Sequence, residues 1–131
     1  MKTRELQRYL KEGGMTVARE VYAITRVTRP CTDSFAIIRD EKEITCVIDE
    51  KKASGRNYSG FDGGWRRLTF DMVLPFDLVG FFAYLTAALA AAGIPIFALS
   101  SYSTDHFFVK DHDLEKAVKT LEGLGLTIRR K

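Results

Sequence analysis

The chain has 131 residues, 46% of them hydrophobic, and a formal net charge of only +3. This composition argues against a disordered chain and fits one compact domain or two small fused units that share a core. The few excess basic residues are scattered, so they do not form the clustered basic face typical of a nucleic-acid-binding protein.

The N-terminal half is predicted to contain one short helix and three strands. Residues 4–12 can form the helix, and the stretches VYAITRV, SFAIIRD and EITCVID have the composition of consecutive strands. The stretch ASGRNYSGFDGG follows and is rich in glycine, so we expect a mobile connection there rather than a strand.

The two cysteines predict neither a zinc site nor a disulfide framework. Cys31 and Cys46 are not arranged as a CxxC motif, and Cys46 lies in an apolar run typical of a buried strand. The N-terminus is charged where a signal peptide would be hydrophobic. We therefore expect a cytoplasmic location and no cofactor.

The C-terminal half begins with a strand and a helix. The stretch WRRLTFDMVL alternates apolar and polar residues as a half-buried strand does, and Pro75 ends it. Asp77 can cap a helix over residues 78–92, which Gly93 would terminate. Residues 78–99 are apolar enough for a membrane span, but Gly93 and Pro95 interrupt them, so a buried or partner-covered helix is the better interpretation.

The remaining elements complete a βαββαβ order. IPIFALS and HFFVK are predicted strands, residues 113–122 have helical spacing, and Leu126 and Ile128 belong to a final strand. The predicted fold class is α+β, a ferredoxin-like sandwich with both helices on one face of an antiparallel sheet. Residues 1–60 would form an incomplete unit packed against a complete unit at residues 65–131.

The stretch FDLVGFFAYLTAALAAAGIPIFALSSYSTDHFFVKDHDLEKAVKTL resembles the ACT-domain family. Asp77 and Gly80 match the Asp-x-x-Gly turn of that family, whereas Val79 stands where many members have proline. The stretch also resembles the subgroup that includes the arginine-sensing CASTOR proteins, although Ser101 replaces its usual threonine. The resemblance covers roughly residues 65–130, and residues 1–60 resemble the subgroup's degenerate first unit only in outline.

The resemblance implies a non-catalytic, allosteric or sensory protein that binds a small ligand, often an amino acid, between ACT units. It also implies a homodimer, with no nucleic-acid or membrane partner. The residue chemistry is compatible with this role, because the turn that starts the helix offers N–H donors and Gly80 permits close approach. On the edge expected to face this turn, serine and threonine hydroxyls can donate or accept hydrogen bonds, and the carboxylate of Asp105 can pair with a cation. The predicted ligand-binding residues are Asp77, Val79, Gly80, Phe81, Ser100, Ser101, Thr104 and Asp105.

Simpler interpretations stay open for several of these residues. Asp77 can be only a helix cap, Gly80 can serve close helix packing, and Asp105 can be an ordinary turn residue. The aromatic residues of the helix, Phe81 and Phe82, fit core or dimer packing.

Metal binding, nucleophilic catalysis and RNA binding are weaker alternatives. His106 and His112 lack the spacing of paired metal ligands on one helix, and nothing in the spacing of the sequence places Cys31 beside His106 as a nucleophile beside a base. The RNA recognition motif shares the βαββαβ order, but its third strand begins with a basic residue and glycine, which STDHFFVKD lacks. An RNA-binding module is therefore the alternative to a small-molecule sensor.

Overall fold

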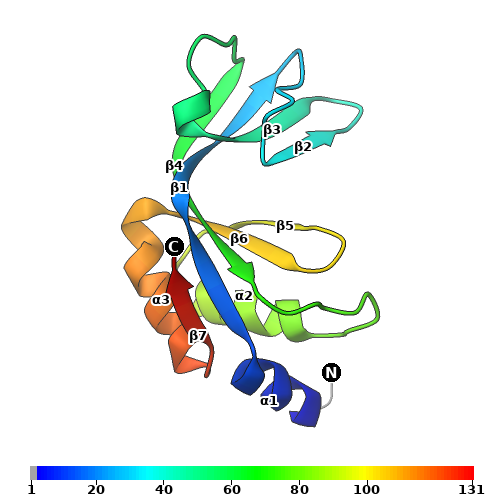
Figure 1. The fold of residues 1–131 in the computed structure, drawn as a ribbon, viewed down its shortest axis with the longest axis vertical. Helices are drawn as coiled ribbons and strands as arrows, with labels where there is room; N and C mark the ends of the chain where they lie inside the picture. The colour runs from blue at the N-terminus through cyan, green and yellow to red at the C-terminus, as the bar shows by residue number, and fades with distance from the viewer. Residues whose placement is uncertain (1–2) are drawn as a thin grey trace.

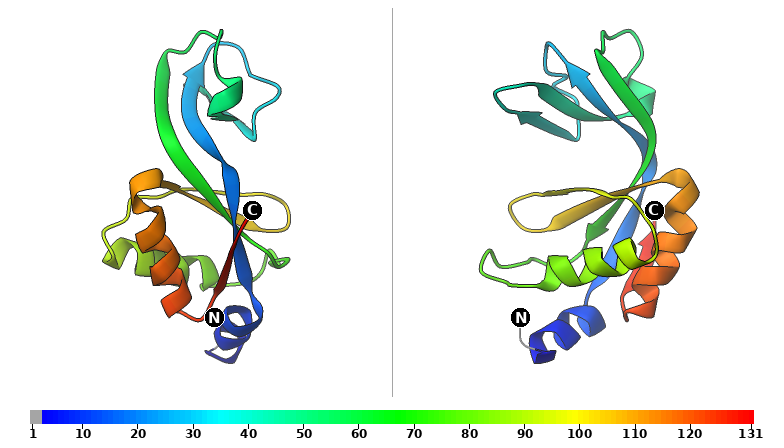
Figure 2. Two further views of the ribbon diagram at one scale, coloured as in Figure 1. Left: turned by 60° about the vertical axis from the view of Figure 1, so that its left-hand side comes forward. Right: turned by 180° about the vertical axis from the view of Figure 1, so that it is seen from behind.

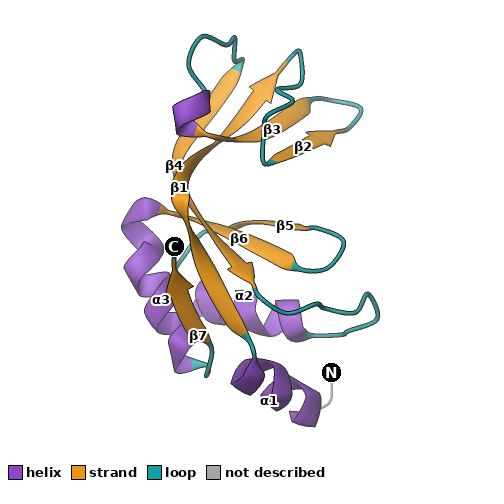
Figure 3. Cartoon of the chain, in the orientation of Figure 1, coloured by secondary structure: helices purple, strands orange, loops and turns teal. Residues whose placement is uncertain are grey.

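The structure is a computed structural model that describes residues 3–131 (Figure 1). Figure 3 distinguishes its helices, strands and loops by colour. In chain order the elements are α1 (Thr3–Glu12), β1 (Gly14–Val27), β2 (Ala36–Arg39), β3 (Ile44–Asp49), the 3-10 helix η1 (Glu50–Lys52), β4 (Gly60–Phe70), α2 (Phe81–Ala91), β5 (Phe97–Ser100), β6 (Asp105–Lys110), the 3-10 helix η2 (Asp111–Asp113), α3 (Leu114–Gly123) and β7 (Thr127–Arg130). From β4 onward the order is βαββαβ, which confirms the predicted α+β fold class.

All the strands belong to one sheet with the order β2-β3-β1-β4-β6-β5, and β7 pairs with β1. Strands β1 and β4 are long and run side by side through the whole molecule (Figures 1 and 2). Their first and last portions serve different neighbours: β2 and β3 extend the sheet at one end, and β5, β6 and β7 extend it at the other. Breaks in the β1–β4 register between Val17 and Val21, and between Tyr22 and Ile24, lie where β1 passes from one end to the other.

Strand β1 occupies the place beside β4 that the last strand takes in a simple ferredoxin-like sandwich. As a result β7 pairs in parallel with β1, through Gly14–Thr127 to Val17–Arg130, while the other neighbouring strands are antiparallel. The N-terminal half therefore contributes a central strand to the C-terminal sheet. The division into a degenerate unit at residues 1–60 and an ACT unit at residues 65–131 stays a prediction.

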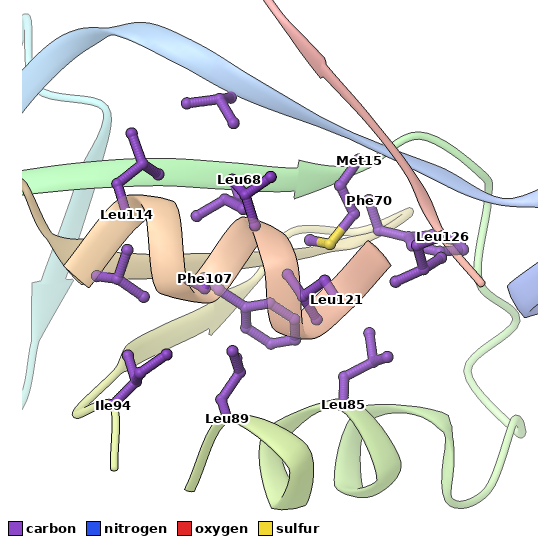
Figure 4. Close-up of a cluster of buried hydrophobic side chains, with 14 of the residues drawn as sticks. Met15, Leu68, Phe70, Leu85, Leu89, Ile94, Phe107, Leu114, Leu121 and Leu126 are labelled. Carbon is purple, nitrogen blue, oxygen red and sulfur yellow. The ribbon is translucent and has the colours of Figure 1, made fainter. Parts of the chain in front are cut away.

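The main core lies between this sheet and helices α2 and α3 (Figure 4). Leu68 and Phe107 point from the sheet toward Leu85 and Leu89 of α2 and Leu121 of α3, and all five side chains are buried. Tyr9 and Leu10 of α1 close the end of the same core. Apolar burial of this extent is the dominant stabilising contribution to the fold.

A second set of contacts covers the sheet face opposite the helices. Phe35, in the loop before β2, lies with its ring centroid 5.1 Å from that of His106 and 5.8 Å from that of Phe108. Tyr22 of β1 packs edge-on against the same Phe108 ring at 5.5 Å. These rings tie the β2–β3 end of the molecule to β6.

Several predicted boundaries are wrong. Residues 60–64 were expected in a mobile connection but begin β4, because Gly60, Phe61 and Asp62 pair with β1. The same strand ends at Phe70 rather than near Leu74, because the chain leaves the sheet after Asp71 donates its N–H to the Gly14 carbonyl at 2.8 Å.

The first long helix starts later than predicted and ends where predicted. It begins at Phe81 rather than Leu78, and its N-cap is Gly80, not Asp77. The preceding turn is closed instead by the Leu78 N–H, which donates to the Pro75 carbonyl at 3.1 Å. Gly93 has a φ of 76° and follows the last turn, as expected for a helix C-terminus.

The apolar stretch over residues 78–99 is not a single helix. It forms the eleven-residue helix α2, a turn and most of β5. Within residues 3–131, no helix is both long and apolar enough to span a membrane.

Replacing Leu121 tests the position of the main core. Leu121 is fully buried, so Leu121→Ala should lower the free energy of unfolding by about 2–5 kcal/mol, through lost apolar contact and a residual cavity. Val73→Ala is the control, because Val73 is 71% exposed, and it should change stability by less than about 0.5 kcal/mol. Urea unfolding measures both, and equal small effects would contradict the assignment.

Candidate functional site

A cavity forms where the segment between β4 and α2 meets the connection between β5 and β6. Both segments project on the same side of the molecule, at the right in Figure 1 (Figures 1 and 2). The Leu74 N–H donates to the Ser103 carbonyl at 2.7 Å and joins them. The cavity has a volume of about 310 Å³. It is lined by Leu74, Pro75, Phe76, Leu78, Phe81, Phe82, Ser100, Ser101, Tyr102, Thr104 and Asp105.

The structure brings most of the predicted ligand-binding residues together, and it separates three from the rest. The residues Phe81, Ser100, Ser101, Thr104 and Asp105 all line the cavity. Asp77, Val79 and Gly80 are exposed and are not among its lining residues. Their role in ligand binding stays a prediction.

One side of the cavity is a polar wall, formed by Ser100, Ser101, Thr104 and Asp105. The Ser100 hydroxyl donates to Asp105 Oδ1 at 2.5 Å, and the Thr104 hydroxyl donates to the Phe70 carbonyl at 2.7 Å. The Ser101 N–H donates to the Thr104 carbonyl at 2.9 Å and closes the turn. These bonds hold the polar wall in place without a ligand.

A buried histidine supports the polar wall from behind. His106 Nε2 lies 3.1 Å from the Ser101 hydroxyl, and His106 Nδ1 lies 2.8 Å from the Thr69 hydroxyl. Arg67 Nη1 donates to the same Thr69 oxygen at 2.6 Å, and the Arg67 guanidinium lies 4.5 Å from the centroid of the Phe35 ring. A polar chain therefore runs from the cavity to the opposite sheet face.

The directions of these hydrogen bonds follow from the arginine, which can only donate. Thr69 accepts from Arg67, and His106 Nδ1 is the other group within hydrogen-bond distance of its hydroxyl, so the tautomer that satisfies the Thr69 proton has Nδ1 as the acceptor and Nε2 as the donor to Ser101. The Ser101 hydroxyl in turn donates to the Thr104 carbonyl at 3.4 Å. In this arrangement no hydroxyl proton lacks an acceptor, and His106 does not act as a base toward Ser101.

The environment of His106 favours its neutral form. Burial lowers the pKa of His106 below its ordinary value of about 6.5, and the positive charge of Arg67 lowers this pKa further. The Asp105 carboxylate opposes the shift in pKa by a smaller contribution. His106 is therefore uncharged at neutral pH.

The start of α2 forms the edge of the cavity opposite the polar wall. Gly80 is the N-cap, with φ 90° and ψ −10°, and no side chain caps the first backbone N–H groups. Phe81 and Phe82 follow directly and line the cavity. This backbone conformation favours glycine at position 80. From the sequence, Gly80 was expected to permit ligand approach or helix packing, and this conformational requirement was not identified.

The other side of the cavity is an apolar wall, formed by Leu74, Pro75, Phe76, Leu78, Phe81 and Phe82. Sequence reasoning missed most of it, because Leu74 was assigned to a strand and Leu78 to a helix. At the rim, Phe76 and Tyr102 are 79% and 83% exposed, and their ring centroids lie 5.1 Å apart. The aromatic residues Phe76 and Tyr102, each in a predicted connection between two elements, were the feature of the sequence that could have indicated this wall.

Neither an RNA-binding surface nor a metal site is supported by residues 3–131. Phe107 and Phe108 are both buried, so neither can stack on an RNA base as the exposed aromatics of an RNA recognition motif do. Among residues 3–131, no three histidine, cysteine, aspartate or glutamate side chains are grouped as a metal site.

The second half of the chain is recognisable by its sequence. Residues 61–123 match the family model described as the ACT domain. This matched segment, the ACT region, contains most of β4, the elements α2, β5, β6 and α3, and all the residues that line the cavity, whereas β1 and β7 lie outside it. No curated protein sequence is significantly similar to the chain.

Solved structures share the fold over nearly the whole chain. A crystal structure of a protein from Agobacterium tumefaciens has a TM-score of 0.79 at 24% identity, and the match covers 91% of this chain and 93% of that one. A protein of unknown function from Vibrio cholerae, described as a possible transport protein, has a TM-score of 0.74 at 22% identity, with 93% and 97% covered. The ligand-free regulatory subunit of aspartate kinase from Thermus thermophilus has a TM-score of 0.65 at 12% identity, with 85% and 95% covered. At these identities the similarity shows the fold alone.

The neutral state of His106 predicts a pH dependence of stability. Because its pKa is lower in the folded protein, the unfolded chain binds more protons below about pH 6.5. The stabilising contribution is complete above that pH and is lost as the pH falls toward the folded-state pKa. The free energy of unfolding in urea should therefore fall between pH 7.5 and 5.5, and His106→Gln should reduce this fall. His112→Gln is the control, because His112 is exposed, and a fall equal to that of the wild type in both variants would contradict the assignment.

Substituting Gly80 tests the start of α2. Gly80→Ala places a Cβ on a backbone with φ 90°, so it should cost about 1–2 kcal/mol of stability with or without a ligand. Gly123→Ala is the matched control, since this helical glycine has no atom within 4 Å of the added Cβ, and it should be neutral or stabilising by about 0.4–1 kcal/mol. Thermal unfolding compares them, and a stable Gly80→Ala variant would refute the assigned conformation.

Proposed function

We propose that this chain is a non-catalytic regulatory protein that binds a small metabolite, an amino acid, in the cavity between the start of α2 and the β5–β6 turn. The observation that carries the proposal is this cavity, which joins an acidic, hydroxyl-rich wall to an uncapped helix start within the ACT region. The regulatory subunit of aspartate kinase that shares the fold supports a sensory role.

The two edges of the cavity complement the two charges of an amino acid. The carboxylate of Asp105 can accept hydrogen bonds from an ammonium group, and Oδ1 is already oriented by Ser100. The first N–H groups of α2 have no partner within the helix and no side-chain cap, so they can donate to a carboxylate. Because Phe81 and Phe82 border the cavity, this helix start lies at its edge.

Ligand binding at this place would hold together two irregular segments. The chain between β4 and α2 and the turn between β5 and β6 are joined by the Leu74–Ser103 bond, and a ligand would add contacts between them. A ligand biases a conformational equilibrium only by binding one state more tightly. The state with the two segments closed on the ligand is the one that binding would favour.

A homodimer that completes the site is part of the proposal. Helix α2 contains no charged residue, and Phe82 and Tyr84, on the two flanks of its buried stripe, are each 39% exposed. An uncharged, partly aromatic helix surface is suited to burial against a second copy. A ligand at an interface between ACT units, as implied by the resemblance to the CASTOR subgroup, would then respond to the relative position of the two copies. We propose that the protein acts in the cytoplasm.

Calorimetric titration with the twenty amino acids tests the function. At least one amino acid should bind, and Asp105→Asn should weaken that binding about ten- to a hundredfold, because a hydrogen bond to a charged group contributes about 1.5–3 kcal/mol. The asparagine oxygen can still accept from Ser100, so the wall should keep its shape.

Glu122→Gln is the matched control, because it removes one exposed negative charge outside the cavity. It should bind as the wild type does. No binding of any amino acid up to about ten millimolar would refute the proposed function.

A further inference from the structure

The polar wall has no hydroxyl proton left to give to a ligand. Ser100 donates to Asp105, and Thr104 donates to the Phe70 carbonyl. With His106 in the neutral tautomer assigned above, Ser101 accepts from Nε2 and donates to the Thr104 carbonyl at 3.4 Å. This wall therefore presents only lone pairs and one carboxylate, so it is suited to a cationic donor and not to an anion.

The cavity has one charged side chain. Among the described residues that line it, only Asp105 carries a charge, and no lysine or arginine is present. One ammonium group can pair with Asp105, and one carboxylate can accept from the neutral N–H groups of α2. A third charge, on the side chain of the ligand, would have no partner among the lining residues.

The rest of the cavity is suited to an apolar side chain. The rings of Phe76 and Tyr102 pack edge to face at the rim, and most of their surface is exposed. Phe82 also lines the cavity, and its ring centroid lies 5.4 Å from that of Phe107. A ligand side chain placed against these rings would remove apolar surface from water. The volume of about 310 Å³ lies at the lower end of small-molecule sites, about 300–1,000 Å³, and is suited to a ligand as small as an amino acid.

We propose that the cavity selects amino acids with an uncharged, apolar side chain, aliphatic or aromatic, and discriminates against acidic and basic ones. This inference rests on the proposed function. The ammonium group pairs with Asp105, the carboxylate lies at the start of α2, and the side chain packs on Phe76 and Phe82.

Each kind of charged side chain is disfavoured for its own reason. An acidic side chain would approach the negative charge of Asp105, or would be buried on the apolar wall without a donor. The side chain of lysine or arginine would compete with its own ammonium group for Asp105, and one of the two cations would stay unpaired. Leucine, methionine and phenylalanine carry no such third charge.

Calorimetric titration of the full chain measures the selectivity directly. Leucine, methionine or phenylalanine should bind at least tenfold more tightly than lysine, arginine, aspartate and glutamate. The compound 4-methylpentanoate, which is leucine without its ammonium group, should bind at least tenfold more weakly than leucine. A charged amino acid as the tightest ligand would overturn the selectivity and leave the proposed function standing, whereas no binding by any amino acid would overturn both.

Two variants of Phe76 locate the side-chain contact. Phe76→Ala should weaken binding of the apolar amino acid at least fivefold without loss of stability, because Phe76 is 79% exposed. Val73→Ala is the matched control, since Val73 is in the same segment, is 71% exposed and does not line the cavity. It should bind as the wild type does.

Phe76→Glu adds the second carboxylate that a basic side chain needs. This variant should shift the ratio of lysine to leucine affinity toward lysine by at least tenfold. Unchanged affinities in both Phe76→Ala and Phe76→Glu would overturn the placement of the ligand side chain on the apolar wall.

Discussion

The antiparallel pairing of β1 with β4 is the interaction on which the rest of the structure depends. The two strands pair from Met15–Phe70 at one end to Arg26–Gly60 at the other, and each end recruits its own neighbours. At one end β4 pairs with β6, and β6 contains both His106 and Asp105 of the polar wall. The irregularities in β1 let a single pair of strands take part in both ends of the molecule. The cavity is thus a consequence of where β4 stops and where β5 and β6 turn.

The polar wall combines a rigid interior with an exposed surface. Its hydroxyls are bound to one another, to the Phe70 carbonyl or to a buried neutral imidazole, so their positions do not depend on a ligand. Such preorganisation reduces the conformational entropy that binding must overcome. The network continues through Thr69 and Arg67 to Phe35, which belongs to the other end of the molecule. A change at Ser101 therefore has a continuous set of contacts through which it can reach the N-terminal half.

Charge distribution gives the cavity a chemical character that the fold alone does not give. ACT-type folds present a helix start and a strand edge side by side, but the residues at that place decide which ligand is accepted. Here the only charged lining residue is Asp105, and the opposite wall is built of leucine, proline and phenylalanine. One carboxylate, uncharged donors and aromatic rings at the rim are the basis of the proposed preference for a zwitterion with an apolar side chain.

The sequence by itself determined the order of elements from residue 65 onward, because alternation, helical spacing and the stop at Gly93 are local properties of the chain. It also singled out Ser100, Ser101, Thr104 and Asp105 as a polar stretch between two apolar strands, and these four residues line one wall of the cavity; their role in ligand binding stays a prediction. Only the tertiary structure decided that β1 enters the sheet between β4 and β7, because strand pairing over long distances depends on which edges are free. It also decided that Gly80 caps α2 in place of Asp77, and that Leu74, Phe76 and Leu78 face the polar wall. These residues lie in an irregular segment without periodicity, and their positions depend on contacts with distant parts of the chain, such as the hydrogen bond from Leu74 to Ser103, about thirty residues away.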